Sequence, residues 1–261
     1  MDPIQDTIIQ VEKVSAGYKN IVILKDVSFE VKRGEIFVIL GGSGCGKSTL
    51  LKLMIGLNKP LSGSIFIDGQ DIVSAEGDER LALLKKFGVM YQRGALFGSM
   101  TLLENVRLPM EVFTDLPFSA MDLIARMKLS LVGLKEFGNL LPAELSGGMQ
   151  KRAAIARAVA LDPQILFLDE LSAGLDPITS AELDHLVLSL AQNLGITFVI
   201  VTHELSSIYA IADRVIMLDK ELKGILAMGR PQDLRDHSEN AFVQRFFNRQ
   251  GVSGTLAEKS S

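Results

Sequence analysis

Cysteine is almost absent from this sequence, because Cys45 is the only one in 261 residues. A single cysteine excludes an internal disulfide. The first residues also lack the basic region, apolar run and small-residue cleavage site of a secretory signal. We therefore expect the protein in the cytosol.

Long apolar runs and an excess of positive charge are missing as well. Runs such as 36–40 and 165–168 fall far short of the roughly 18 residues that a membrane span requires, so we expect no segment that crosses a bilayer. The net charge is -4, whereas a protein that binds nucleic acid normally carries excess positive charge to displace counterions. Nucleic acid is not expected as a partner. The mean hydropathy of +0.27 leaves room for an apolar docking surface.

What is present is an alternation of short apolar strands with helical segments, which predicts an α/β fold with a parallel core sheet. Strands are predicted at 8–11, 27–31, 36–40, 64–67, 87–91, 165–168 and 197–201, and helices after Gly46, at 146–160 and from 180 to about 194. From Gly94 to about Glu144 apolar residues recur at helical spacing, so an inserted helical subdomain is expected. Residues 251–261 have little to bury and are predicted to be a disordered tail.

The first motif with chemical meaning follows the apolar run 36–40. Its residues are Gly41, Gly42, Ser43, Gly44, Cys45, Gly46, Lys47 and Ser48. They fit G-x-x-x-x-G-K-[ST] between a strand and a helix, the context of a phosphate-binding loop. Backbone N–H groups would surround phosphate oxygens, Lys47 would reach the β- and γ-phosphates of ATP, and Ser48 would ligate Mg²⁺. The alternative is a glycine-rich turn.

Two carboxylates follow the buried strand 165–168. Asp169 would hold Mg²⁺ through water, and Glu170 would orient and deprotonate the attacking water. Gln92 and His203 also follow predicted strands, and ligands of open α/β sheets bind at the carboxyl ends of the strands. A lone glutamine or histidine is usually structural, but four strands that bring polar groups to one edge predict a site.

A second phosphate-binding pattern begins at Leu145. Ser146 is a candidate N-cap, Gly147 and Gly148 expose N–H groups, and the following helix carries Lys151, Arg152 and Arg157. The simpler interpretation is a helix cap. The pattern has no lysine directly after its glycines and no magnesium ligand, so a phosphate bound here must also be held from another direction.

In order and spacing these motifs resemble those of ABC ATPases over about residues 7–235, and the Leu-Ser-Gly-Gly sequence at 145–148 is close to diagnostic. The resemblance implies a P-loop NTPase fold with an N-terminal antiparallel β subdomain. It also implies that Tyr18 stacks on adenine, that Thr49 joins the phosphate loop in nucleotide binding, and that Gln92 senses Mg²⁺ and links to a membrane subunit. His203 would contact the γ-phosphate.

The resemblance further implies a head-to-tail homodimer, in which Ser146 and Gly147 of one copy complete the site that Lys47 of the other begins. Asp176 would lie at the dimer seam. The ABC ATPase domain is predicted to span 7–238, with the helical subdomain at about 94–150, and residues 239–261 would form a C-terminal helix and tail. Leu171 stands where many members of the family have proline, and only a change in loop stiffness is expected.

The finer resemblance is to the ATPases of Mla/Mce-type lipid transporters, through residues 94–97, 104–106 and 176–179. It implies lipid transport between bacterial membranes from the cytoplasmic face of the inner membrane. The implied partners are a YrbE/MlaE-type permease, an MCE-domain protein and a small STAS-domain subunit. Another cargo, iron-sulfur cluster assembly, and a soluble ABC protein of translation or DNA repair are the alternatives.

Three apolar or reactive features have two interpretations each. The side chains of Leu96, Phe97, Met100 and Leu102 either line a groove for a cytoplasmic helix of the permease or form the subdomain core. The stripe at 242, 243, 246 and 247 either packs on its own domain or docks on a neighbouring subunit. Cys45 lies in the phosphate loop, so we expect a thiol alkylator to block ATP hydrolysis and bound ATP to protect.

Overall fold

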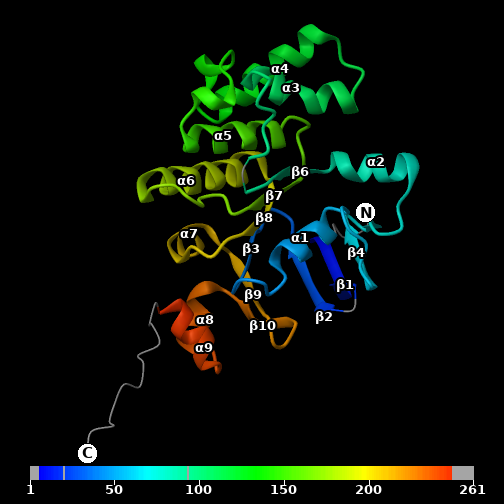
Figure 1. Ribbon diagram of the computed structural model, residues 1–261, viewed down its shortest axis with the longest axis vertical. Helices are drawn as coiled ribbons and strands as arrows, with labels where there is room; N and C mark the ends of the chain where they lie inside the picture. The colour runs from blue at the N-terminus through cyan, green and yellow to red at the C-terminus, as the bar shows by residue number, and fades with distance from the viewer. Residues whose placement is uncertain (1–5, 20, 93, 249–261) are drawn as a thin grey trace, which may run out of the picture.

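The computed structural model describes residues 6–19, 21–92 and 94–248 (Figure 1). Its strands are β1 (Thr7–Tyr18), β2 (Ile21–Lys32), β3 (Ile36–Gly41), β4 (Ser62–Ile67), β5 (Gln70–Asp71), β6 (Phe87–Met90), β7 (Ile165–Asp169), β8 (Thr197–Val201), β9 (Arg214–Asp219) and β10 (Gly224–Gly229). Its α-helices are α1 (Lys47–Met54), α2 (Gly77–Lys85), α3 (Leu102–Phe113), α4 (Phe118–Leu131), α5 (Gly147–Ala158), α6 (Pro177–Leu194), α7 (Leu205–Ile211), α8 (Pro231–His237) and α9 (Ala241–Phe247). Short 3₁₀ turns occupy Lys135–Phe137 and Pro142–Glu144.

The larger sheet has six strands in the order β10-β9-β3-β8-β7-β6. From β9 to β6 neighbouring strands are parallel, and β10 adds an antiparallel edge. Every residue of β3 is buried. Phe37 and Ile39 belong to one apolar cluster with α1, whereas Val38 and Leu40 belong to another with α5 and α6. The continuous apolar run of β3 thus reflects a parallel sheet covered on both faces.

The smaller sheet is antiparallel, in the order β2-β1-β4-β5, and confirms the predicted N-terminal β subdomain. Its first two strands are 12 residues each, far longer than the predicted 8–11 and 27–31. The register shifts between Val11 and Val14, and Lys13 has a φ of 46°. Such a bulge changes which residues face the core, so the alternating pattern used for prediction stops there although the strand continues.

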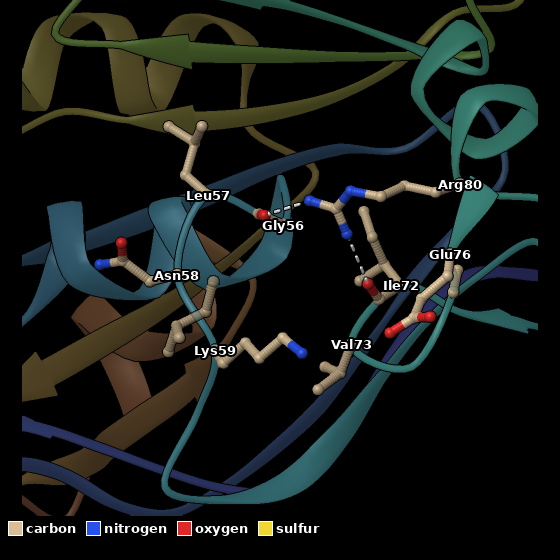
Figure 2. A pocket seen from close by; sticks show the side chains of 10 residues that line it. Gly56, Leu57, Asn58, Lys59, Ile72, Val73, Glu76 and Arg80 are labelled. Atoms are coloured by element: carbon tan, nitrogen blue, oxygen red, sulfur yellow. Dashed lines mark hydrogen bonds between the residues drawn. The ribbon is translucent and has the colours of Figure 1, made fainter.

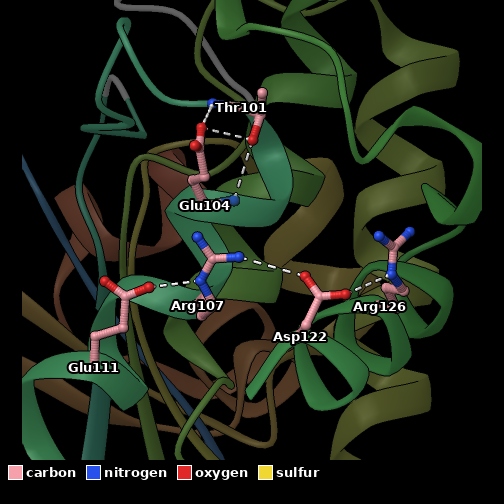
Figure 3. Close-up of polar contacts among 6 residues, drawn as sticks. All are labelled: Thr101, Glu104, Arg107, Glu111, Asp122 and Arg126. Atoms are coloured by element: carbon pink, nitrogen blue, oxygen red, sulfur yellow. Dashed lines mark hydrogen bonds and ion pairs between the residues drawn. The ribbon is translucent and has the colours of Figure 1, made fainter. Parts of the chain in front are cut away.

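The predicted helical insertion consists of α3 and α4, which pack on each other and on α5. Figure 3 shows the polar contacts that fix its geometry. Thr101 and Glu104 form a capping box at the start of α3. Arg107 pairs with Glu111 in α3 at 2.5 Å and with Asp122 in α4 at 3.4 Å, and its guanidinium lies over the ring of Phe118. One largely buried arginine therefore joins the two helices.

Most of the elements that the sequence did not predict lie after Val201, namely α7, β9, β10 and α8. The others are α2 and the two-residue β5. α9 packs on α8, and its Val243 and Phe247 are buried in the main core. Half of the apolar stripe at 242–247 therefore packs on its own domain. The boundary between 238 and 239 stays a prediction, and the predicted tail at 251–261 lies outside the described residues.

Candidate nucleotide site

The phosphate loop connects β3 to α1 at the carboxyl edge of the large sheet. Gly41 has a φ of 148°, and a Cβ there would lie 2.5 Å from the carbonyl oxygen of Leu218, so only glycine fits. Gly46 is the N-cap of α1 with a φ of 106°, and no side chain caps this helix. The first-turn N–H groups of α1, together with the positive end of the helix dipole, can therefore bind an anion.

Lys47 reaches back over this loop. Its ammonium donates to the carbonyl oxygens of Gly41 at 2.8 Å and Gly42 at 3.1 Å. It also faces a cavity of about 500 Å³. The cavity is lined by Gly41, Gly42, Ser43, Lys47, Glu170, His203, Met217, Phe242 and Phe246. Six of the predicted site residues, from three separate segments, are thus brought to one cavity.

Asp169 and Glu170 follow β7, which lies two strands from β3. Oδ1 of Asp169 is buried and has no hydrogen-bond partner among the described residues, and burial raises the pKa of this carboxyl although Lys47 opposes the effect. Glu170 has a φ of 51°, uncommon for a residue with a side chain. Its N–H donates to the carbonyl of Val201 at 2.8 Å. The strand ends therefore hold Glu170 in a strained conformation.

His203 follows β8 and contacts this carboxylate. Its Nδ1 lies 3.0 Å from Oε1 and 2.9 Å from Oε2 of Glu170, and its ring is largely exposed. A hydrogen bond to a carboxylate requires the proton on Nδ1, which leaves Nε2 as the other ring nitrogen available to a ligand. Because β3, β8 and β7 are adjacent and parallel, the phosphate loop, His203 and Glu170 meet at one edge.

The signature loop is built differently. Ser146 caps α5, and its hydroxyl accepts from the N–H of Met149 at 3.3 Å. Ser146 and Gly147 are exposed. Gly148 is buried, and a Cβ there would lie 2.5 Å from Cγ2 of Thr179. None of the three lines the cavity at Lys47. In one copy of the chain the two phosphate-binding patterns do not meet.

Asp176, Tyr18 and Gln92 also lie outside that cavity lining. Asp176 caps α6 by accepting from the N–H groups of Ile178 and Thr179, and the hydrogen bond from the Thr179 hydroxyl is the first cause of a lowered pKa. Tyr18 is half exposed, and its hydroxyl accepts from Asn58 after α1. The Gln92 side chain is exposed, which leaves it accessible to a partner.

Three residues at the cavity were not predicted to be there. Met217 comes from β9, and Phe242 and Phe246 come from α9. The sequence stripe at 242–247 signalled an amphipathic helix but not which element its second face would meet. Lys151 was also assigned no role, although it is buried and donates to backbone carbonyls of Gln92 and Glu170. The sequence places Lys151 shortly after the signature loop but does not reveal that its side chain is buried.

Side-chain burial decides three of the expectations. The Cys45 side chain is only 1 % exposed and lies in the core cluster beneath the loop, so an alkylator cannot reach it in the folded chain. Leu102 is fully buried in the subdomain core, and only Phe97 of the four residues proposed for a groove is strongly exposed. Leu171 is likewise buried in the core, so it contributes packing rather than loop stiffness alone.

A second hollow, of about 350 Å³, lies between the loop after α1 and the segment joining β5 to α2 (Figure 2). Arg80 of α2 crosses it and donates to the carbonyl oxygens of Gly56 at 2.5 Å and Ile72 at 3.2 Å. Its lining contains none of the residues predicted to bind nucleotide. The arginine here joins two backbone segments, so the cavity at Lys47 is the candidate nucleotide site.

Comparison with known proteins decides the family. The family described as ABC transporter matches residues 24–173. The chain belongs to this family. It is an ATP-binding and ATP-hydrolysing subunit of a transporter, with the P-loop NTPase fold predicted from the motifs. No helix among the described residues is long and apolar enough to cross a membrane.

Two relatives of this ABC ATPase subunit carry different descriptions. The chain is 39 % identical over 253 residues to the probable ribonucleotide transport ATP-binding protein mkl of Mycobacterium tuberculosis H37Rv, covering 96 % of this chain and 70 % of that protein. It is 39 % identical over 229 residues to the intermembrane phospholipid transport system ATP-binding protein MlaF of Escherichia coli K12, covering 87 % and 84 %. Both matches extend over most of this chain.

Solved structures agree with the fold. The ATP-binding cassette MJ0796, in a dimeric post-hydrolysis state bound to ADP and Pi, has a TM-score of 0.77 and 32 % identity, with coverage of 85 % of this chain and 98 % of that one. The cassette cbiO1 of Clostridium perfringens, part of the transporter complex cbiONQ, has a TM-score of 0.80 and 31 % identity, with 88 % and 90 % covered. The ADP and Pi in the first are products of ATP hydrolysis.

Proposed function

We propose that this subunit energises the transport of lipid between bacterial membranes through a separate permease. The cavity shared by Lys47, Glu170 and His203 supports the part of the proposal that concerns energy. The likeness at residues 94–97, 104–106 and 176–179, together with the phospholipid transport named for MlaF, supports the lipid cargo. The ribonucleotide transport named for mkl makes another cargo the second candidate.

In this proposal the loop from Gly41 to Thr49 holds the phosphates of ATP. At Gly42 and Gly44 a Cβ would have nothing within 4 Å, so the loop presents an open surface of backbone to the ligand. Lys47 exchanges its contacts with the Gly41 and Gly42 carbonyls for the β- and γ-phosphates. The exchange replaces two neutral acceptors with charged ones, and charge-assisted hydrogen bonds are about twice as strong as neutral ones.

The residues present fit Mg²⁺. Oδ1 of Asp169 is a buried oxygen that no group in the described part of the chain hydrogen-bonds, and Ser48 is exposed at the first turn of α1. Hard oxygen donors of this kind are what Mg²⁺ prefers, with water and phosphate completing the shell. Ser48, Asp169 and Gln92 would hold the ion, whose charge would neutralise the phosphates during transfer.

Glu170 is placed to accept a proton from the attacking water. Its carboxylate lines the cavity opposite Lys47, and His203 holds it through Nδ1. The other face of the imidazole would contact the γ-phosphate. A base oriented by a hydrogen-bonded neighbour and directed into the site is the arrangement that general base catalysis requires.

The second half of the site would come from a second copy. The exposed Ser146 and Gly147 begin a helix whose positive end can bind the γ-phosphate. The lysine of this helix, Lys151, is buried and donates to backbone carbonyls instead. Shifting a dimer from 1:99 to 99:1 needs about 5.5 kcal/mol of differential contact. Hydrogen bonds to charged groups contribute about 1.5–3 kcal/mol each, so two to four from the signature loop are sufficient.

The remaining partners follow from the finer likeness. We place the subunit on the cytoplasmic face of the inner membrane, with a YrbE/MlaE-type permease, an MCE-domain protein and a STAS-domain subunit. The exposed Phe97, five residues after Gln92, is the apolar side chain best placed to contact a cytoplasmic helix of the permease.

Two variants of the full-length chain test the chemistry. Lys47→Ala should weaken ATP binding at least tenfold in calorimetry, since it removes a charge-assisted contact. Glu170→Gln should retain ATP binding and lower kcat by about 10²–10⁴, the range for a general base. Normal turnover by the glutamine variant would remove Glu170 from the role of base. Identification of lipids that co-purify with the native complex would test the cargo.

A further inference from the structure

Lys151 is a charged side chain held inside the protein. It lies in the second turn of α5, the helix that begins at the signature loop, and is only 7 % exposed. Lysine is rarely buried unless its ammonium is paired or hydrogen-bonded, because removal of the charge from water is strongly unfavourable. Burial lowers the pKa of Lys151, and the carboxylates of Asp169 and Glu170 oppose this effect. The hydrogen bonds of the Lys151 ammonium must therefore account for its burial.

The ammonium joins two functional loops through their backbones. Lys151 donates to the carbonyl oxygen of Gln92, the second residue after β6, and to the carbonyl oxygen of Glu170, the first residue after β7, at 3.2 Å. β6 and β7 are neighbouring parallel strands. The two loops that leave them are thus connected by one side chain from a third element.

The contact with Glu170 acts on a strained residue. With a φ of 51°, Glu170 occupies a conformation that persists only when the surroundings enforce it. Its carbonyl accepts from Lys151 and from the N–H of Ala173 at 3.3 Å, and its own N–H donates to Val201. Rotation of this peptide would redirect the carboxylate, so the ammonium helps to fix the direction in which the carboxylate points.

A second cation of the same helix provides the contrast. Arg157 donates to the carbonyl oxygens of Ala95 at 2.7 Å and Gly94 at 2.9 Å. It therefore holds the loop after Gln92 against α5, as Lys151 does. Of the two, only Lys151 also reaches Glu170.

We propose that Lys151 is a positioning residue that links the Gln92 loop to Glu170, so that the direction of the catalytic carboxylate depends on how the loop is seated. This inference rests on the proposed function, which makes Glu170 the base. A partner that displaces the loop moves the Gln92 carbonyl, and the ammonium carries this displacement to the Glu170 peptide. When the Gln92 loop is fully packed in place, the Glu170 carboxylate points in the productive direction.

The test compares three substitutions in the full-length chain. Lys151→Met keeps the length of the side chain but removes its donors, and it should lower kcat 10- to 100-fold, because a misplacement of about 1 Å can cost 10²-fold. KM and the affinity for ATP should stay within twofold of wild type, since Lys151 does not line the nucleotide cavity. Lys151→Arg, which retains charge and donors, should recover part of kcat.

Two matched controls come from the same helix. Arg152→Met removes a pair with Glu182 of α6 and should leave kcat within twofold. Arg157→Met removes two bonds to the loop but none to Glu170, so its kcat should fall at least fivefold less than that of Lys151→Met. Thermal melting of every variant identifies a loss that comes from unfolding.

The outcomes distinguish a wrong role for Lys151 from a wrong assignment of Glu170 as the base. If Lys151→Met retains kcat, or if Arg157→Met loses as much, the link is overturned and the lysine only seats the loop. A loss that Lys151→Arg does not recover in a folded protein also contradicts the link. If Glu170→Gln itself turns over normally, the proposed base is wrong, whereas an inactive Glu170→Gln beside a fully active Lys151→Met rejects only the link.

Discussion

Two helix starts in this molecule have the same local chemistry and different surroundings. α1 begins after Gly46 and α5 begins after Ser146, and each presents glycines and a positive helix end. Around α1 there is a cavity with Lys47 and a carboxylate, whereas the start of α5 is exposed and lies outside that cavity. In the proposed nucleotide site at α1, Lys47, Glu170 and His203 line one cavity with Met217, Phe242 and Phe246, and the start of α5 contributes no residue to that lining.

The comparison also explains why one helix has a serine cap and the other has none. In the proposed site at α1 the phosphates would satisfy the first N–H groups, so a capping side chain would compete with them. At α5 the Ser146 hydroxyl satisfies the Met149 N–H at 3.3 Å, which stabilises the helix while no phosphate is present. The signature loop can thus remain folded in a free monomer.

The largest effect is expected from a charge at the start of α5. Ser146→Asp keeps a good N-cap, so the melting temperature should not fall. The carboxylate would repel the γ-phosphate brought by a second copy, and loss of two or more charge-assisted bonds costs at least about 3 kcal/mol, or over 100-fold in affinity. In the Glu170→Gln background, size-exclusion chromatography with ATP should show a dimer without this change and a monomer with it.

A mixing experiment sharpens that result. Ser146→Asp and Lys47→Ala each damage both sites of their own homodimer, but a mixed dimer contains one intact composite site. Turnover should therefore reappear when the two inactive proteins are combined. No recovery at any ratio would mean that the signature loop acts on its own copy, or not at all.

A smaller effect is expected from the apolar wall of the cavity at Lys47, which consists of Met217, Phe242 and Phe246. Phe246→Ala should admit water beside Lys47 and His203. The water should weaken the interactions between charges in the site, because these interactions are stronger in a dry site. We expect a three- to tenfold fall in kcat, about 1 kcal/mol of barrier. Phe137→Ala, at an exposed phenylalanine of the helical subdomain, is the control. Equal effects of the two substitutions on kcat would show that the wall has no local role.

Most of the α1 site could be predicted because its chemistry follows local patterns. Lys47 and Glu170 were assigned from a loop motif and a strand end, and the order of the parallel strands brings them together. Phe246 and Lys151 could not be assigned in this way. Each depends on which element packs against its helix, and no spacing in the sequence encodes that choice. The bulge at Lys13 concealed half of β1 for a related reason, since it resets the alternation.

The smallest expected effect concerns the glycine that seats the α5 loop. A Cβ at Gly148 would lie 2.5 Å from Cγ2 of Thr179, so Gly148→Ala should lower the free energy of unfolding by about 1–3 kcal/mol through overpacking. Thr179→Ser removes that methyl group and keeps the hydroxyl that bonds Asp176. The double variant should therefore regain most of the loss in urea unfolding. The contrary result is that Gly148→Ala leaves stability unchanged and abolishes ATP-dependent dimerisation. That result would mean that Gly148 contacts the nucleotide, as the glycines at the start of α1 are proposed to do.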